Sequence, residues 1–235
     1  MNNAKQLLLS VQPVPTHNET SCDVIAFDFV LQLVKLLQNC RIMIQDNLVL
    51  DIQNPLQKYK SPDGNIGEAL SGSVYREAYS KYVKHPERKL FVPIIQWIDR
   101  TYVTGNDRFS LKPYMFSPAI FAETFCRRIE AWGYHGFFPK SRASSAQNQI
   151  QPQGDNLCKY HAQIKVVLHT FTTANDRLKN VTIPIGPTGQ MTVDVKTYIL
   201  FIIQCKKATY CVAALVRTHQ RFNVNVGLAM STLMT

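Results

Sequence analysis

The stretch "KLFVPIIQWID" at residues 89–99 decides the fold, because it is a long apolar run, rich in β-branched residues, that ends on a single acid. Such a run predicts a buried strand. A second run, "VTIPIGPTGQMTVDVKTYILFIIQ" at residues 181–204, predicts a strand, a Gly-Pro-Thr-Gly turn and a long strand. The two runs therefore place a sheet in the second half of the chain.

Helical spacing and turn residues organise the remaining sequence. Gly105-Asn106-Asp107 predicts a hairpin turn within residues 100–116, and "GYHGFFPK" predicts a short strand or turn. Helices are predicted for segments 24–39, 68–84, 117–132 (opened by Ser-Pro) and 155–171. The predicted organisation is a loose tail at 1–23, a helical N-terminal region at 24–87, a mixed α/β domain at 88–204 and a different tail at 205–235.

Composition favours a globular chain with an anionic partner. The 235 residues are 46% hydrophobic and carry a formal net charge of +10, with a pI near 9.4. A positive excess of this size is typical of nucleic-acid-binding proteins, although a basic protein without such a partner has the same composition. The six cysteines are widely spaced and no apolar stretch approaches 18 residues, so we expect a reduced intracellular protein that does not span a membrane.

Asp99 is the first candidate catalytic residue. It follows an apolar strand, a position where α/β folds place reactive groups, although strand-end acids commonly cap the next turn instead. A two-metal site needs several carboxylates around ions about 3.5–4 Å apart. The expected place for a second acid is the end of "TYILFIIQ", where the chain has Cys205. Asp107 is predicted to lie in a turn, and Asp194 lies near the start of its strand, at the wrong end of the sheet. Neither acid is therefore expected beside Asp99.

Basic and aromatic residues form the candidate nucleic-acid surface. Tyr102, Tyr114 and Trp132 are possible stacking platforms for bases, and the alternative is an ordinary solvated face with core aromatics. We expect His135 and His161 to be hydrogen-bonded structural residues, since no metal-ligand spacing includes them. Cys205, Cys211 and His219 fit no common zinc pattern. The candidate cations are Arg100, Arg108, Lys112, Arg127, Arg128, Lys140 and Arg142.

Several motifs resemble one family. "GEALSGSVYREAY", the Asp-x-Thr at Asp99–Thr101, "AWGYHGFFPK", "GDNLCKYHAQI" and "YILFIIQ" are similar to segments of transposon-derived proteins of eukaryotic genomes. Those proteins are related to the transposases of CACTA (En/Spm) and Plavaka-type elements. The resemblance covers residues 24–204.

The resemblance implies a ribonuclease-H-like domain, in which a first strand pairs with a later parallel strand and each ends in a catalytic acid. Asp99 matches the first acid. The second acid would follow "YILFIIQ", where Cys205 stands, and a third would lie beyond Thr235. An intact ancestor would use Mg²⁺. We therefore expect an incomplete ribonuclease-H-like mixed sheet that holds no cofactor and cleaves no DNA.

Our hypothesis for the departure at residue 205 is a shift of the reading frame. Between Cys205 and Thr235 the chain has no acid, and Cys205 is followed by two lysines. "CKKATYC" can be encoded by DNA that reads Met-Gln-Glu-Gly-Asp-Leu-Leu-Cys one base out of step, and codons for residues 224–229 then permit a Cys-x-x-Cys. The hypothesis is a transposase-derived fragment with an out-of-frame, weakly packed tail, nuclear if functional. The alternatives are a non-enzymatic basic DNA-binding module and a structural protein without a nucleic-acid role.

Overall fold

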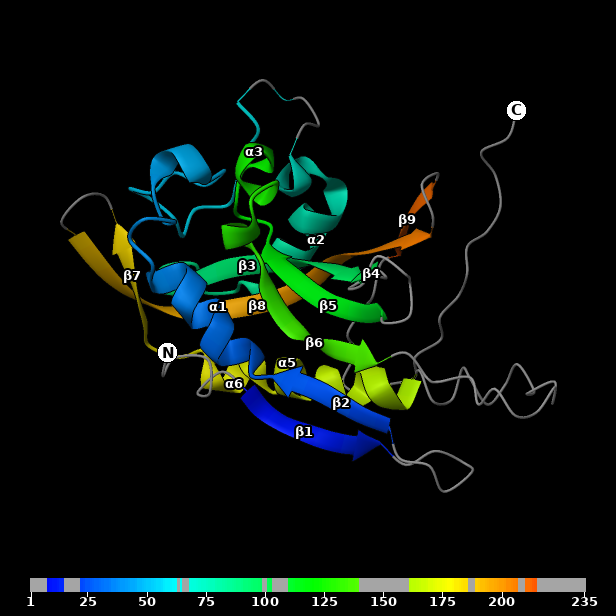
Figure 1. The fold of residues 1–235 in the computed structure, drawn as a ribbon. Coiled ribbons are helices and arrows are strands. Elements are labelled where there is room, and N and C mark those ends of the chain that lie inside the picture. The colour runs from blue at the N-terminus through cyan, green and yellow to red at the C-terminus, as the bar shows by residue number, and fades with distance from the viewer. Residues whose placement is uncertain are drawn as a thin grey trace, which may run out of the picture.

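A curved mixed sheet forms the centre of the molecule and carries helices on both faces (Figure 1). The computed structural model describes residues 8–14, 22–62, 64, 68–98, 101–102, 110–139, 161–185, 189–206 and 210–214. The strand order is β1 (Leu8–Val14), β2 (Cys22–Phe27), β6 (Gly133–Pro139), β5 (Ser110–Pro118), β3 (Lys89–Ile98), β8 (Gly189–Lys206) and β7 (Val181–Ile185). Two short strands complete the sheet: β4 (Thr101–Tyr102) pairs with β5, and β9 (Tyr210–Ala214) pairs with β8.

The two long strands β3 and β8 are neighbours and run parallel. Their register begins with Lys89 opposite Asp194 and ends with Ile98 opposite Gln204. On one side of this pair, β5 and then β6 follow β3 as an antiparallel meander. On the other side, β7 pairs antiparallel with β8. The strands predicted within residues 89–99, 100–116 and 181–204 are thus confirmed, while the predicted turn at Gly105 lies outside the described residues.

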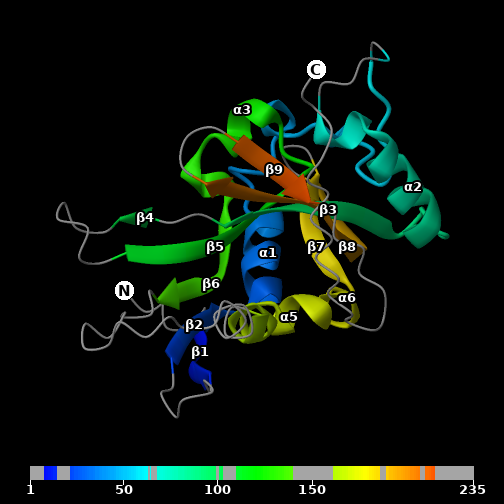
Figure 2. The ribbon, with the colours of Figure 1, turned by 90° about the vertical axis from the view of Figure 1, so that its right-hand side faces the viewer.

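Helices form a layer on each side of the sheet. Helix α1 (Phe29–Gln38), helical residues 161–167, α5 (His169–Thr172) and α6 (Ala174–Arg177) lie on one side. Figure 2 shows α2 (Ser73–Tyr82) and α3 (Glu123–Cys126) on the other side of β3. Single helical turns are present at Gln45–Asn47, Ala69–Ser71 and Ile129–Ala131. The mixed α/β class predicted from the sequence is therefore correct.

Aromatic side chains join each helical layer to the sheet. Phe29 of α1 packs on Phe116 of β5 with ring centres 4.7 Å apart. On the other face, Tyr75 and Tyr79 of α2 both contact Phe91 of β3, at 5.9 and 5.8 Å. Because successive residues of a strand point to opposite faces, β3 contributes to both cores. This double burial matches the nearly continuous apolar sequence of β3.

Helix α1 is fixed to its neighbours by polar contacts at two points. Asp28 Oδ1 accepts hydrogen bonds from the backbone N–H groups of Val30 and Leu31, which caps the helix, and its Oδ2 pairs with Arg177 Nη2 at 2.7 Å. One turn later, the Gln32 amide donates to the Tyr134 carbonyl and accepts from the Tyr134 N–H, at 2.5 and 2.7 Å. Gln32 therefore bonds to the edge of β6 as a neighbouring strand would.

The predicted helix at residues 24–39 is wrong in its first part. Strand β2 includes Val24 through Phe27, and the burial of these residues alternates, with Val24 and Ala26 fully buried. Helix α1 begins only after Asp28, whose carboxylate caps it. The predicted loose tail at 1–23 also contains β1, which pairs antiparallel with β2. Strands from before residue 28 and after residue 88 therefore share one sheet.

The predicted helix at residues 117–132 is also largely wrong. Ser117 and Pro118 belong to β5, where Ser117 lies opposite Ile95 of β3, and only α3 and one helical turn follow. The buried Ser117 hydroxyl donates to the carbonyl of Ala131, so it does not cap a helix. The predicted second helix is shorter than expected, because α2 spans only Ser73–Tyr82.

Part of the predicted out-of-frame tail is in the sheet. Strand β8 continues through Cys205 and Lys206, and β9 returns beside it so that Cys205 lies opposite Cys211. Residues 215–235, which include the strand-like "NVNVGLAM", lie outside the described residues. Over the described part of the chain, no helix combines the length and the apolar character needed to cross a membrane.

Candidate functional site

The parallel strands β3 and β8 reach the same edge of the sheet, where the resemblance implies a pair of acids. Their last paired residues are Ile98 and Gln204, and the positions that follow along the chain are 99 and 205. Asp99 lies outside the described residues. Cys205 belongs to β8, but its side chain is not among those described. The backbone register is thus the part of this candidate site that the structure describes.

Asp194 lies at the opposite end of the sheet, as its sequence position predicts. It pairs with Lys89, the first residue of β3. Its Oδ1 accepts a hydrogen bond from the N–H of Asn180, at 3.0 Å. Asn180 has a φ of 54°, in the left-handed region that asparagine tolerates better than most residues. Asp194 therefore stabilises a turn far from the ends of β3 and β8.

Arg127 and Arg128 are the two candidate nucleic-acid-binding residues with described side chains. Both follow α3 and are exposed. Arg127 pairs with Glu123 at 2.7 Å, but these side chains are 75% and 68% exposed, so the pair contributes little stability. Arg128 lies over the ring of Phe125, at 5.9 Å from its centre. Lys112 belongs to β5 by its backbone; Arg100, Arg108, Lys140 and Arg142 lie outside the described residues.

The predicted stacking platforms differ in their accessibility. Tyr114 is 1% exposed and its hydroxyl donates to Gln96 Oε1 at 2.5 Å, so its prediction as a platform is wrong. Trp132 is half-buried. Its indole N–H donates to the carbonyl of Cys126 at 2.8 Å, and its ring meets Trp97 edge to face at 5.6 Å. Trp132 is therefore held in a fixed position beside Arg127.

A buried polar group joins three strands at the centre of the sheet. Gln96 of β3, Tyr114 of β5 and His135 of β6 are each at most 1% exposed. Because the Tyr114 hydroxyl donates to the Gln96 carbonyl oxygen, the Gln96 amide donates to His135 Nε2, at 3.3 Å. This assignment puts the ring proton on Nδ1, which is buried without a hydrogen-bond partner. His135 is thus a hydrogen-bonded structural residue, as predicted.

Burial sets the charge of His135. It lowers the pKa of the imidazole to about 3, because the charged form cannot be solvated inside the sheet. The ring stacks on Phe29, with centres 5.3 Å apart, and also meets Phe116 and Phe171. His135 is consequently neutral near pH 7 and surrounded by aromatic rings. The sequence signal for this group is Gln96, a polar residue inside an otherwise apolar strand.

Within the described ranges, no three His, Cys, Asp or Glu side chains converge in a way that could hold a metal ion. Cys126 is half-buried, and burial raises the pKa of its thiol, which disfavours a reactive thiolate. The chain matches no protein-family model, and comparisons with curated proteins and with solved structures found no match.

Proposed function

We propose that this protein derives from a transposase with a ribonuclease-H-like domain and that it does not cleave DNA. The observation that carries the proposal is the parallel register of β3 and β8, with Ile98 opposite Gln204. This is the strand pairing that the resemblance of the sequence implies. It supports a common edge for the two positions that carry the first two acids in the family.

The proposed loss of activity follows from the residue at the second position. Mg²⁺ binds oxygen ligands, chiefly carboxylates, phosphates and water. A cysteine sulfur is a soft ligand that selects other metals. With Cys205 in place of the acid, Asp99 would have to hold two ions alone, and two-metal catalysis needs several converging carboxylates.

A strand-cleavage assay tests this proposal. The full chain is incubated with supercoiled plasmid and Mg²⁺, and nicked and linear products are measured over time. The expected result is no cleavage above that of the Asp99→Ala variant. Mg²⁺-dependent cleavage that Asp99→Ala abolishes would overturn the proposal. Genomic DNA across codons 203–236 tests the frame hypothesis separately, since the shifted frame must encode the acidic segment.

A second candidate function is DNA binding without catalysis, and the net charge of +10 with exposed Arg127 and Arg128 favours it. Each phosphate contact releases counterions, so affinity should fall steeply as salt rises. Binding to a duplex measured between about 50 and 200 mM salt tests this function. Binding that is undetectable or independent of salt would favour the structural role without nucleic acid.

A further inference from the structure

Five aromatic residues lie together on the face of the sheet opposite α1. They are half-buried and come from β2, β3, β6 and the turn before β6. We call this group the aromatic face; its members are Phe27, Trp97, Trp132, Tyr134 and Phe137.

The strand register explains why these rings share one face. Trp97 lies opposite Met115, which in turn lies opposite Tyr134, so the three form one row across β3, β5 and β6. Phe137 lies opposite Ile25 of β2, two residues before Phe27. The irregularity in the β5–β6 register places His135 on the other face, where it stacks on Phe29 of α1.

The rings of the aromatic face contact one another in two groups, one at each end. Tyr134 and Phe137 stack with centres 5.3 Å apart, and Phe27 meets Phe137 at 5.8 Å. Trp97 and Trp132 form the edge-to-face pair at the other end. The Trp97 indole N–H is buried without a hydrogen-bond partner. The rings are thus ordered by mutual packing and keep part of their surface accessible.

Of the described helices, α3 lies beside Trp132 at one end of this face, and the others lie elsewhere. Helix α1 packs on the other side of β6, where Phe29 and His135 stack. Helix α2 packs on the aromatic side of β3, but at Phe91 near the start of that strand. Antiparallel strands such as β2, β6, β5 and β3 commonly leave one sheet face to solvent, but that face is normally polar. A row of half-buried rings on it therefore indicates a binding surface.

Positive charge lies at the edge of this face. Trp132 is hydrogen-bonded to the carbonyl of Cys126, so Arg127 and Arg128 lie within one turn of its ring. Only an exposed ion pair engages Arg127, and such pairs are easily exchanged for a phosphate. Fixed aromatic rings beside exposed cations form the combination that binds single-stranded nucleic acids, because bases stack on the rings and phosphates pair with the cations.

We propose that the aromatic face binds single-stranded DNA by stacking its bases on Tyr134, Phe137 and Trp132. This inference rests on the nucleic-acid ancestry proposed above and adds a binding mode to it. A duplex is a poorer ligand for the same surface, since its bases stack on each other and do not present their faces.

Tryptophan fluorescence measures this binding directly. The chain has two tryptophans, Trp97 and Trp132, and both belong to the aromatic face. The full chain is titrated with a thymidine oligonucleotide and with a duplex of equal length. We expect the single strand to quench the fluorescence to saturation and to bind more tightly than the duplex. Tyr134→Leu and Phe137→Leu, which keep an apolar side chain, should each weaken binding of the single strand roughly tenfold.

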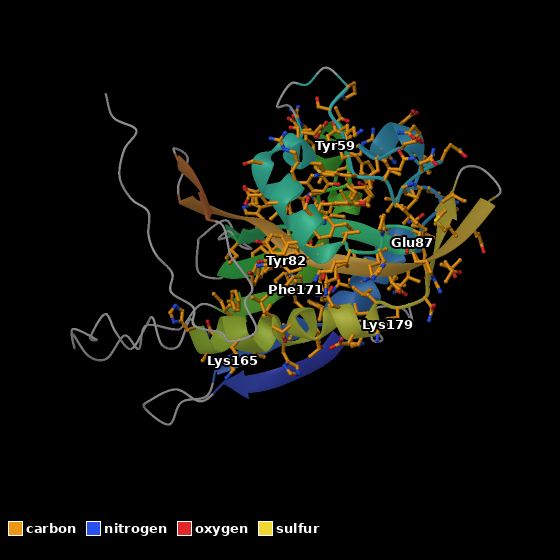
Figure 3. The ribbon with its side chains drawn as sticks, turned by 180° about the vertical axis from the view of Figure 1, so that it is seen from behind. Tyr59, Tyr82, Glu87, Lys165, Phe171 and Lys179 are labelled. Carbon is orange, nitrogen blue, oxygen red and sulfur yellow. The ribbon has the colours of Figure 1, made fainter. Side chains whose placement is uncertain are left out.

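Tyr59→Leu is the matched control. Tyr59 is also a half-buried tyrosine, but it lies against α2, where its N–H bonds to the Tyr75 hydroxyl (Figure 3). This variant should bind as the unmodified chain does, and circular dichroism checks that all three variants fold. Equal affinities of the Tyr134, Phe137 and unmodified chains, together with salt-dependent binding, would overturn the inference and leave the proposed ancestry intact. The inference would also be overturned if the chain associated with itself through the aromatic face and did not bind DNA.

Discussion

The buried His135 should make the protein unstable in mild acid. Burial lowers the imidazole pKa to about 3, whereas the unfolded chain has the ordinary value near 6.5. The unfolded state therefore binds a proton more readily than the folded state below pH 6.5. Stability from this group is complete above about pH 6.5 and falls as pH decreases toward 3.

The size of the effect follows from the two pKa values. Each pH unit within this window removes up to about 1.4 kcal/mol from the free energy of unfolding. At pH 4.5 the loss is about 3 kcal/mol, a large share of the stability of an ordinary domain. No discount for solvent screening applies, because His135 is fully buried.

Urea unfolding at a series of pH values between 7 and 4 measures this loss. The control is His135→Gln, which removes the titrating ring and keeps an amide that can bond to Gln96. Its free energy of unfolding is expected to be lower at pH 7, where the hydrogen-bond geometry suffers, but to vary less between pH 6.5 and 4.5. Parallel pH profiles for the two proteins would refute the assignment of a neutral, buried imidazole.

Three further predictions concern single side chains. Asp28→Ala should cost about 2 kcal/mol or more in chemical unfolding, because the helix cap is lost and Arg177 loses its buried partner, while Asp28→Asn should cost less. Gly136→Ala should disrupt the β2–β6 pairing, since a Cβ there overlaps the Ile25 carbonyl oxygen; weaker amide protection in β2 would report it, and unchanged protection would contradict the prediction. Burial raises the pKa of Tyr75 to about 12, so stability should fall between pH 10 and 12 and less so in Tyr75→Phe.

The strands that were predicted correctly are those whose residues clearly fit the sequence pattern of a strand. The run at β3 is apolar at almost every position, and the segment at 181–204 carries the turn-forming sequence Gly-Pro-Thr-Gly between two apolar runs. Both patterns therefore favour strands. The parallel arrangement of β3 and β8 came from the resemblance, since nothing in either run specifies its neighbour.

The errors arise where a short segment is compatible with both a helix and a strand. Val24 to Phe27 fit a helical pattern with the residues after them, yet they alternate as β2 because β1 and β6 lie on either side. Asp28 was the local signal for the true helix start. The Ser117–Pro118 pair has the chemistry of a helix start, but pairing with β3 overrides it.

The candidate site could be predicted only in part for a related reason. Gln96 is visible as a polar residue in an apolar strand, but its partners Tyr114 and His135 come from other strands. The aromatic face could not be predicted from the sequence, because the irregular β5–β6 register decides on which face of the sheet each ring lies. Register is a tertiary property, set by packing and turns.

The amide of Gln32 links the two layers of the molecule mechanically. It holds the backbone N–H and carbonyl of Tyr134 from α1, while the ring of the same residue is presented on the opposite face. A ligand that restrains the ring should slow the opening of the hydrogen bond to Gln32. Hydrogen exchange at the Tyr134 amide of β6, which bonds to Gln32 of α1, would then report whether the other side of the sheet is occupied.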